Sequence, residues 1–502
     1  MARAQLVKQG VFHYTGQLAP VLSSIVLVPF MLGHLGVEAY GFWIVALAAP
    51  GFAVGLDNAL YVSIAREAAA HRGLSRISES ETGRFLSACC GAYVALGVLC
   101  VLWIGGTGVF LVRHLHLSAE LRTTAPIVFG SVAIGFVAGR ATAFANAVLA
   151  GFQRFGTMNA ISVGVLAGRF VGFVALLTYH YSLGAIAVWY MTTGVVESVV
   201  ALGFAHRLGA VHFDRSLVEW RRLRQVGSFG VSSFLTTVVQ NIWWFSPPMI
   251  VGLMAGGAGA TAALYTGQRP CFIVSELNWR GAEVLFSASA GADEPNAEDR
   301  HSELLIFGTK CLLAVAMPLC IGLYLLAPAL LSVWLNVPPS GTERIMRITA
   351  LGVIADALWV GPLHVLWGRG RARAVLMITS VVTGLGLLLT VVSVAHMGTP
   401  GAAWAFAISS WVGAIVTLIV AARETATSWL KFLLGTVGEV AIPSAAMVVF
   451  VLGATLAIRG NPLVFLLLGA LGGGTLYAII FLLQQRIQGH SVSGFAQAFR
   501  RT

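Results

Sequence analysis

The chain alternates between long apolar stretches and short polar connections along nearly its whole length. Each stretch holds about 20 residues or more, the length that a helix needs to cross a bilayer. The pattern predicts an all-α integral membrane protein with about fourteen transmembrane helices. They cover approximately residues 10–33, 41–62, 85–112, 124–150, 157–178, 184–205, 228–252, 260–286, 304–334, 346–368, 374–396, 401–421, 433–456 and 461–484.

The charges in the connections predict the orientation of these helices. With the amino terminus in the cytoplasm, most of the 31 lysine and arginine residues fall on the cytoplasmic side. The connections on the other side hold only Arg113, Arg122, Arg344, Arg347 and Arg459. Cytoplasmic loops are enriched in positive charge, so we expect a multi-pass protein with both termini in the cytoplasm. The first span lacks a cleavage site and is expected to be retained.

Composition agrees with this prediction and excludes several functions. Only 10% of the residues are charged, against about 25% in a soluble protein, and the mean hydropathy is +0.84. The net charge of +11 is explained by topology, so we expect no binding to nucleic acid. The six cysteines lie in apolar stretches without metal-ligand spacing, and no nucleotide-binding loop occurs. We therefore expect no metal, no catalytic residues and no cofactor.

An internal repeat relates two halves of the chain. A shift of 217 residues aligns spans four to six with spans ten to twelve without a gap, and Gly151 and Arg154 then meet Gly368 and Arg371. The repeat predicts two six-helix bundles related by a pseudo-two-fold axis along the membrane normal, plus two additional helices. The expected divisions are residues 1–206, a basic cytoplasmic linker at 207–227, residues 228–422, and a region at 423–502 with two additional helices and a cytoplasmic tail.

Ten ionisable residues fall inside the predicted spans. At about 2.5 to 3.5 kcal/mol for each central charge, ten side chains facing lipid would cost roughly 25 to 35 kcal/mol, so they must face protein or water. Lys310 lies near the cytoplasmic end of its span and is expected to extend its amine to that surface. The others are Asp57, Arg140, Arg169, Glu197, Arg269, Glu276, Arg280, Glu283 and Asp356.

The eighth span carries its charges on one narrow face. On a helical wheel Glu276, Arg280 and Glu283 lie within roughly 40° of Arg269. Such a face would line a hydrated cavity. Alternatively, Arg280 would pair with Glu276 and Glu283 in a structural ladder, whereas Arg269 has no partner within one turn.

Arginines in such a cavity favour an anionic ligand, because guanidinium groups bind phosphate oxygens in a bidentate way. We expect Arg269, Arg140, Arg169 and Arg280 to bind a lipid-linked phosphate or diphosphate, unless they pair with acidic residues of other helices. The residues that we expect to line the cavity or to take part in ion coupling are Asp57, Glu197, Glu276, Glu283, Asp356, Gln240 and Asn241. Coupling to H+ or Na+ would use the acidic residues. Pro29, Pro247 and Pro248 are hinge candidates because they remove helical hydrogen bonds.

Four short motifs along the chain resemble segments that recur in a known family of membrane transporters. Leu35-Gly36-Val37-Glu38-Ala39-Tyr40-Gly41-Phe42-Trp43 resembles the family's signature between the first two helices. Similar segments are Asp57-Asn58-Ala59-Leu60, with Ala59 where the family commonly has glycine, Leu149-Ala150-Gly151-Phe152-Gln153-Arg154, and Tyr265-Thr266-Gly267-Gln268-Arg269. Their order and placement identify a resemblance to the bacterial polysaccharide flippases of the multidrug/oligosaccharidyl-lipid/polysaccharide exporter superfamily, which is MATE-like.

The resemblance implies a fold, a substrate and a location. It implies two bundles that open alternately inward and outward, and transport of an undecaprenyl-diphosphate-linked oligosaccharide across the bacterial inner membrane for O-antigen, capsule or exopolysaccharide synthesis. In related lipid II flippases an arginine of the eighth helix is associated with the diphosphate, a role that carries over to Arg269. A polysaccharide polymerase and export machinery are the implied protein partners.

Two other functions stay open at this point. One is an ion-coupled multidrug exporter of the same superfamily. The other is a membrane glycosyltransferase or polymerase, although the chain has short outer connections and no Asp-x-Asp pair.

Overall fold

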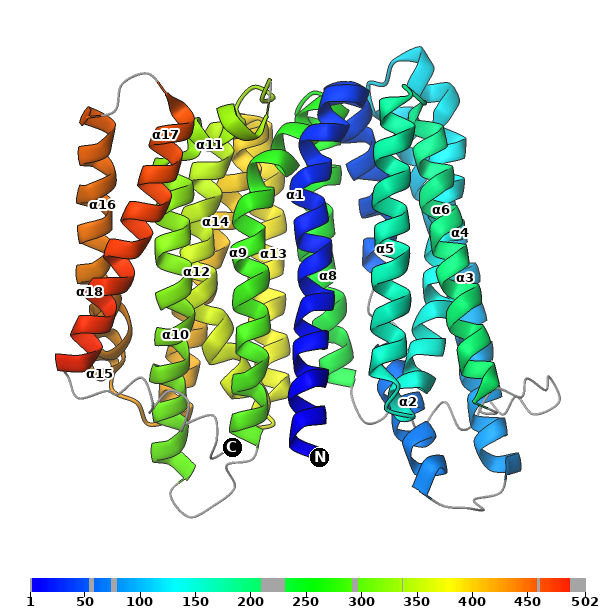
Figure 1. The fold of residues 1–502 in the computed structure, drawn as a ribbon, viewed down its shortest axis with the longest axis horizontal. Coiled ribbons are helices and arrows are strands. Elements are labelled where there is room, and N and C mark those ends of the chain that lie inside the picture. Colours follow the sequence, from blue (N-terminus) through cyan, green and yellow to red (C-terminus); the bar gives the residue numbers. More distant parts are fainter. Residues whose placement is uncertain are drawn as a thin grey trace. The chain divides into compact units, whose positions relative to one another are not determined.

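The computed structural model describes residues 2–53, 58–73, 79–208, 231–290, 297–335, 337–457 and 461–487. Over these residues the regular structure is entirely helical. Eleven of the helices searched are long and apolar enough to cross a membrane. The predicted all-α membrane fold is therefore confirmed. The chain divides into two compact units, residues 1–262 and 263–502, which are described separately below (Figure 1).

The first unit contains seven helices and one short 3-10 segment among the described residues. They are α1 (Ala2–Ala48), the 3-10 helix η1 (Ala49–Ala53), α2 (Asn58–Gly73), α3 (Glu79–His114), α4 (Ala119–Gly151), α5 (Phe155–Thr178), α6 (Leu183–Arg207) and α8 (Val231–Met254). Helix α8 packs against α1 and η1 and so belongs to this unit. The predicted linker at 207–227 lies almost entirely outside the described residues.

The second unit begins within α9 (Ala258–Ala290). It continues with α10 (Ala297–Leu325), α11 (Ala327–Trp334), α12 (Thr342–Gly368), α13 (Ala372–Met397), α14 (Thr399–Glu424), α15 (Trp429–Leu433), α16 (Glu439–Ala457), α17 (Pro462–Leu467) and α18 (Gly473–Ile487). Two π-helical turns, η3 (Leu434–Gly438) and η4 (Leu468–Gly472), join α15 to α16 and α17 to α18. Helix α12 is the central helix, with neighbours α10 and α14.

Several predicted spans are interrupted. The predicted helix at 41–62 was wrong in its extent, because α1 ends at Ala48 and a 3-10 turn containing Pro50 follows. Proline removes a backbone donor and clashes with the preceding turn, which explains the break. The predicted span at 304–334 is likewise divided at Leu326, two residues before Pro328.

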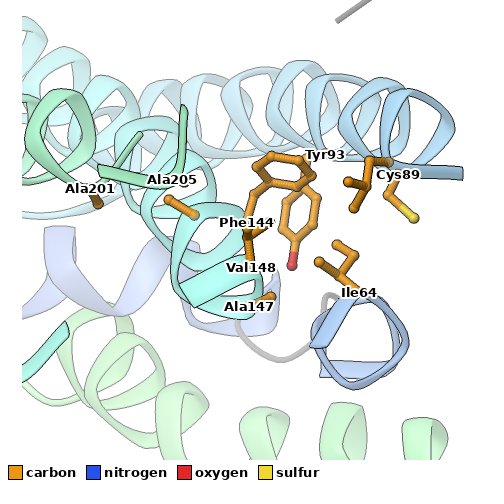
Figure 2. Packing of buried hydrophobic residues seen from close by; sticks show 10 residues of the cluster. Ile64, Cys89, Tyr93, Phe144, Ala147, Val148, Ala201 and Ala205 are labelled. Atoms are coloured by element: carbon orange, nitrogen blue, oxygen red, sulfur yellow. The ribbon is translucent and has the colours of Figure 1, made fainter. Parts of the chain in front are cut away.

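The core of the first unit is built from small and aromatic side chains of four helices. Figure 2 shows the ring of Tyr93 from α3 facing that of Phe144 from α4, with Ile64 of α2 nearby. The two rings meet edge to face, with centroids 5.9 Å apart. Ala201 and Ala205 present the small side chains of α6 to the same cluster, so α6 can approach α4 closely.

The internal repeat reappears in the backbone of the two units. Arg154 donates its backbone N–H to Leu149 at 2.9 Å, and the equivalent Arg371 donates to Leu366 at 3.0 Å. The φ and ψ angles of these arginines are −88° and 44°, and −81° and 42°. The turn that joins α4 to α5 therefore has the geometry of the turn that joins α12 to α13. The pseudo-two-fold relation of the whole bundles stays a prediction.

Gly151 and Gly368 end α4 and α12 where another helix approaches. A Cβ atom on Gly151 would lie 2.6 Å from the carbonyl oxygen of Ala65 in α2. A Cβ atom on Gly368 would lie 2.5 Å from that of Phe286 in α9. The motif glycine thus permits one close helix contact in each unit.

Candidate functional site

Arg169 of α5 is oriented by two residues of α6 within the first unit. Its Nε–H donates to the hydroxyl of Thr193 at 2.9 Å, and that hydroxyl donates in turn to the carbonyl oxygen of Tyr190 at 2.9 Å. The guanidinium carbon lies 4.7 Å from the centre of the Tyr190 ring, a cation–π contact. The two terminal amino groups of Arg169 make no hydrogen bond to any described residue, so they remain able to bind an anion.

Trp43 supports this arrangement from α1. Its ring meets Tyr190 edge to face at 5.5 Å, and Phe173 of α5 at 6.4 Å. Trp43 is buried, so it fixes the Tyr190 ring by packing and is not itself a surface for a ligand. The first signature motif thereby contributes indirectly to the position of Arg169.

Glu197 lies one turn beyond Thr193 on α6 and is half-buried. It accepts a hydrogen bond from the hydroxyl of Ser162 at 3.3 Å. It also attracts Arg169 electrostatically, but the two side chains form no ion pair within 4 Å among the described residues. The charge of Arg169 is therefore only partly compensated by Glu197.

The other charges predicted for the first half have different surroundings. Arg140 of α4 is half-buried, with its guanidinium carbon 4.5 Å from the centre of the Phe136 ring. Asp57 lies outside the described residues. Among the described charges of the first unit, Arg169 and Glu197 therefore lie on the neighbouring helices α5 and α6, and Arg140 lies on α4 beside Phe136.

In the second unit Arg269 forms an ion pair with Glu276. The Nη1 to Oε1 distance is 2.7 Å, and the side chains are 14% and 38% exposed. The two residues are seven apart, so they lie about two turns along the same face of α9. Arg269 therefore has an acidic partner beyond the single turn considered from the sequence. Its assignment to a ligand stays a prediction.

Arg280 and Glu283 are exposed on the same face of α9. Neither forms an ion pair with another described side chain, so the local ladder predicted as the alternative does not form here. The opposite face of α9 is buried, for example at Cys271, Val274 and Ala282. The charged residues are thus gathered on one face of α9, opposite its buried face.

Asp356 of α12 is a buried carboxylate, only 2% exposed. The Ser275 hydroxyl donates to it at 2.6 Å and the Trp359 indole N–H at 3.0 Å. The described residues supply it with no ion-pair partner. An ionised carboxylate without a counter-charge is costly to bury. The assignment of Asp356 to ion coupling stays a prediction.

The polar and proline candidates of α8 and α1 are half-buried. The side-chain nitrogen of Gln240 is buried and has no hydrogen-bond partner among the described residues, whereas Asn241 makes polar interactions. Helical geometry continues through Pro29, Pro247 and Pro248, and α1 instead breaks at Gly36, where φ is +81°. The hinge assignment of the prolines stays a prediction.

Lys310 does not extend to the membrane surface, contrary to the prediction. It is 5% exposed and donates to the side-chain oxygen of Gln485 in α18 at 3.1 Å. Gln485 donates in turn to Glu439 of α16 at 2.7 Å. A buried amine satisfied by a neighbouring helix gains nothing by extending to solvent, so Lys310 joins the two additional helices to α10.

The residues that orient the candidate charges were missed from the sequence. Thr193 and Tyr190 lie on a different helix from Arg169, and Ser275 lies 81 residues from Asp356. The only available signal was their place inside a span. A hydroxyl group within an apolar helix forms a hydrogen bond either to its own backbone or to another polar side chain.

Comparison with known proteins supports the resemblance. No protein-family model matches the chain. A putative O-antigen transporter of Shigella flexneri is 22% identical over 389 residues, covering 74% of this chain and 87% of that protein. The lipid II flippase MurJ, in an inward closed conformation, aligns with a TM-score of 0.74 at 13% identity, over 96% of this chain and 99% of MurJ.

An inward-facing multidrug resistance MATE transporter of the MOP superfamily aligns with a TM-score of 0.65 at 16% identity, over 82% of this chain and 94% of that transporter. These likenesses concern the arrangement of helices, which the motifs in the sequence had already implied. The chain therefore has the fold of the multidrug/oligosaccharidyl-lipid/polysaccharide (MOP) superfamily of transporters.

Proposed function

We propose that this protein is a flippase for an undecaprenyl-diphosphate-linked oligosaccharide, and that it works by alternating access. It would act in the bacterial inner membrane, with both termini in the cytoplasm, during synthesis of O-antigen, capsule or exopolysaccharide. It would serve a polysaccharide polymerase and export machinery. The likeness to a putative O-antigen transporter and to the MurJ fold supports the proposal.

The observation that carries the proposal is the geometry of Arg169. Its Nε is held by Thr193 and its plane lies near the Tyr190 ring, while both terminal amino groups are available. A guanidinium presented in this way matches the spacing of two phosphate oxygens and remains charged when partly buried. A single fixed charge of this kind suits a diphosphate better than an uncharged sugar.

The other candidates would assist at different steps. Arg140, Arg269 and Arg280 would offer further positive charge to the diphosphate as it moves. Glu276, already paired with Arg269, would be displaced by the ligand. The buried amide nitrogen of Gln240 would donate to a sugar hydroxyl.

Asp356 is our candidate for ion coupling. Two neutral donors hold its carboxylate, and no described cation neutralises it. Binding of H+ or Na+ would supply the missing positive charge, and the gradient of that ion would then drive the cycle. Glu197 is a second candidate, because Arg169 compensates it only in part.

A multidrug exporter is the second candidate function, favoured by the likeness to a MATE transporter. Such a protein would export a cationic dye from cells. Arg169 would then be unfavourable to the substrate, because like charges repel, and its loss would leave export intact or improve it.

The test is complementation of a strain that lacks its polysaccharide flippase. The wild-type protein should restore surface polymer and reduce the lipid-linked intermediate on the cytoplasmic leaflet. Arg169→Gln should abolish both effects at unchanged protein level, whereas Arg207→Gln, which removes an exposed arginine at the end of α6, should not. Dye export without complementation would favour the multidrug exporter, and full export by Arg169→Gln would contradict the role of Arg169.

A further inference from the structure

A groove of about 420 Å³ lies within the first unit between α3 and α8. Its walls include Trp103, Gly106, Phe110 and Leu111 of α3 and Met249 and Leu253 of α8. The volume falls within the range of about 300 to 1,000 Å³ that is typical of small-molecule sites. Because its walls are apolar, the groove suits a hydrocarbon chain.

The groove has the length of one leaflet. Its lining on α3 runs from Leu102 to Leu111, which are nine helical steps apart, or about 13–14 Å at 1.5 Å per residue. Half of a hydrocarbon core about 30 Å thick is about 15 Å. A hydrocarbon chain lying in the groove would therefore reach from about the bilayer midplane to the headgroup region.

Two basic side chains stand at the end of the groove. His114 stacks on Phe110, a wall residue, with ring centroids 4.3 Å apart, and its Nδ1 lies 2.8 Å from the Phe110 carbonyl oxygen. This bond fixes the orientation of the imidazole ring. Arg113 is exposed in the same last turn of α3. Beyond the end of α3, Ser118 donates its backbone N–H to the carboxylate of Glu38 at 2.8 Å.

The groove also contacts the interruption in the chain after α1. The indole N–H of Trp103 donates to the carbonyl oxygen of Ala49 at 3.0 Å, where the 3-10 segment begins. On the other wall, Met249 directly follows the Pro247–Pro248 pair of α8. A hydrocarbon chain packed against Trp103 would therefore protect its hydrogen bond to Ala49 and stabilise the 3-10 segment.

The geometry points to a binding site for an anionic phospholipid in the leaflet at the carboxyl end of α3. One acyl chain fills the groove, because an empty groove would lose dispersion contacts on one side. The phosphate is bound by the guanidinium group of Arg113, as basic residues beside transmembrane helices bind acidic headgroups. The positive charge selects an anionic lipid over a zwitterionic lipid with the same chains.

The experiment measures lipid retention by the purified full-length protein. The protein is mixed in detergent with equal amounts of phosphatidylglycerol and phosphatidylcholine of identical chains, and bound lipids are counted by native mass spectrometry. The wild-type protein should retain more phosphatidylglycerol than phosphatidylcholine. Removing the cation with Arg113→Gln should reduce that preference by up to about fivefold, which corresponds to about 1 kcal/mol for one charge near the surface.

A matched pair of glycine substitutions tests the groove itself. A Cβ atom on either Gly105 or Gly106 would meet nothing within 4 Å, but only Gly106 lines the groove. Gly106→Leu should reduce retention of phosphatidylglycerol, and Gly105→Leu should not.

Three results would overturn the proposal. They are equal retention of the two lipids by wild type, equal retention by the two glycine variants, and displacement of phosphatidylglycerol by undecaprenyl phosphate at this groove. The last result would assign the groove to the transported lipid. If Gly106→Leu fails to fold, the Arg113→Gln variant still decides the outcome, because it leaves the walls intact.

Discussion

The ion pair between Arg269 and Glu276 can separate a structural role from a ligand role. We consider exchanging the charges, Arg269→Glu with Glu276→Arg, together with each single change. A hydrogen bond to a charged group contributes about 1.5 to 3 kcal/mol. With exposed fractions of 14% and 38% the pair lies between buried and surface pairs, so each single change should cost at most about that amount.

The measurement is the melting temperature of the purified protein in detergent, combined with polymer export in the complementation strain. A loss of 1 kcal/mol lowers the melting temperature by roughly 2–4 °C for a unit of this size. Each single variant should melt several degrees lower, and the exchange should recover most of that loss. Export should nevertheless stay absent in the exchanged variant, because the cation has left position 269. Full export by the exchanged variant would show that Arg269 serves only to pair with Glu276.

Three further predictions concern single contacts. Thr193→Val removes the hydroxyl that accepts from Arg169, and should lower export about tenfold or more at unchanged protein level, while Thr193→Ser retains it. Gln485→Leu leaves the buried amine of Lys310 without its acceptor and should lower the melting temperature; adding Lys310→Met should restore it, and no recovery would contradict the network. Gly368→Ala places a Cβ atom 2.5 Å from the Phe286 carbonyl oxygen and should cost about 1–3 kcal/mol of stability. Gly384→Ala, which meets nothing within 4 Å, is its control, and equal melting of the two variants would refute the close helix contact.

The helices were predictable because a bilayer imposes one rule on every span. Runs of about 20 apolar residues have to satisfy their backbone internally, and only helices do so within a single segment. The breaks were harder to predict, since proline has different effects in different places. Pro247 and Pro248 lie inside a continuous helix, whereas Pro50 lies in a 3-10 turn. Which outcome occurs depends on the neighbours of the helix, and these are not visible in the local pattern.

The candidate charges were predictable as a set but their partners were not. Periodicity placed Arg269 and Glu276 on one face, and the structure pairs them across two turns. Lys310 was expected to reach the surface because its sequence position allowed it, yet Gln485, 175 residues away, satisfies it inside the protein. Such long-range partners are determined by how the helices pack, and the sequence of one span does not show which helix packs against it.

The central claim is that Arg169 holds the diphosphate of a lipid-linked oligosaccharide. The direct measurement is transfer of an undecaprenyl-diphosphate-linked oligosaccharide between the leaflets of vesicles that contain purified protein, under an imposed ion gradient. Wild type and Arg207→Gln should transfer the lipid, and Arg169→Gln should leave it in its original leaflet. Equal transfer by Arg169→Gln and wild type would contradict the account.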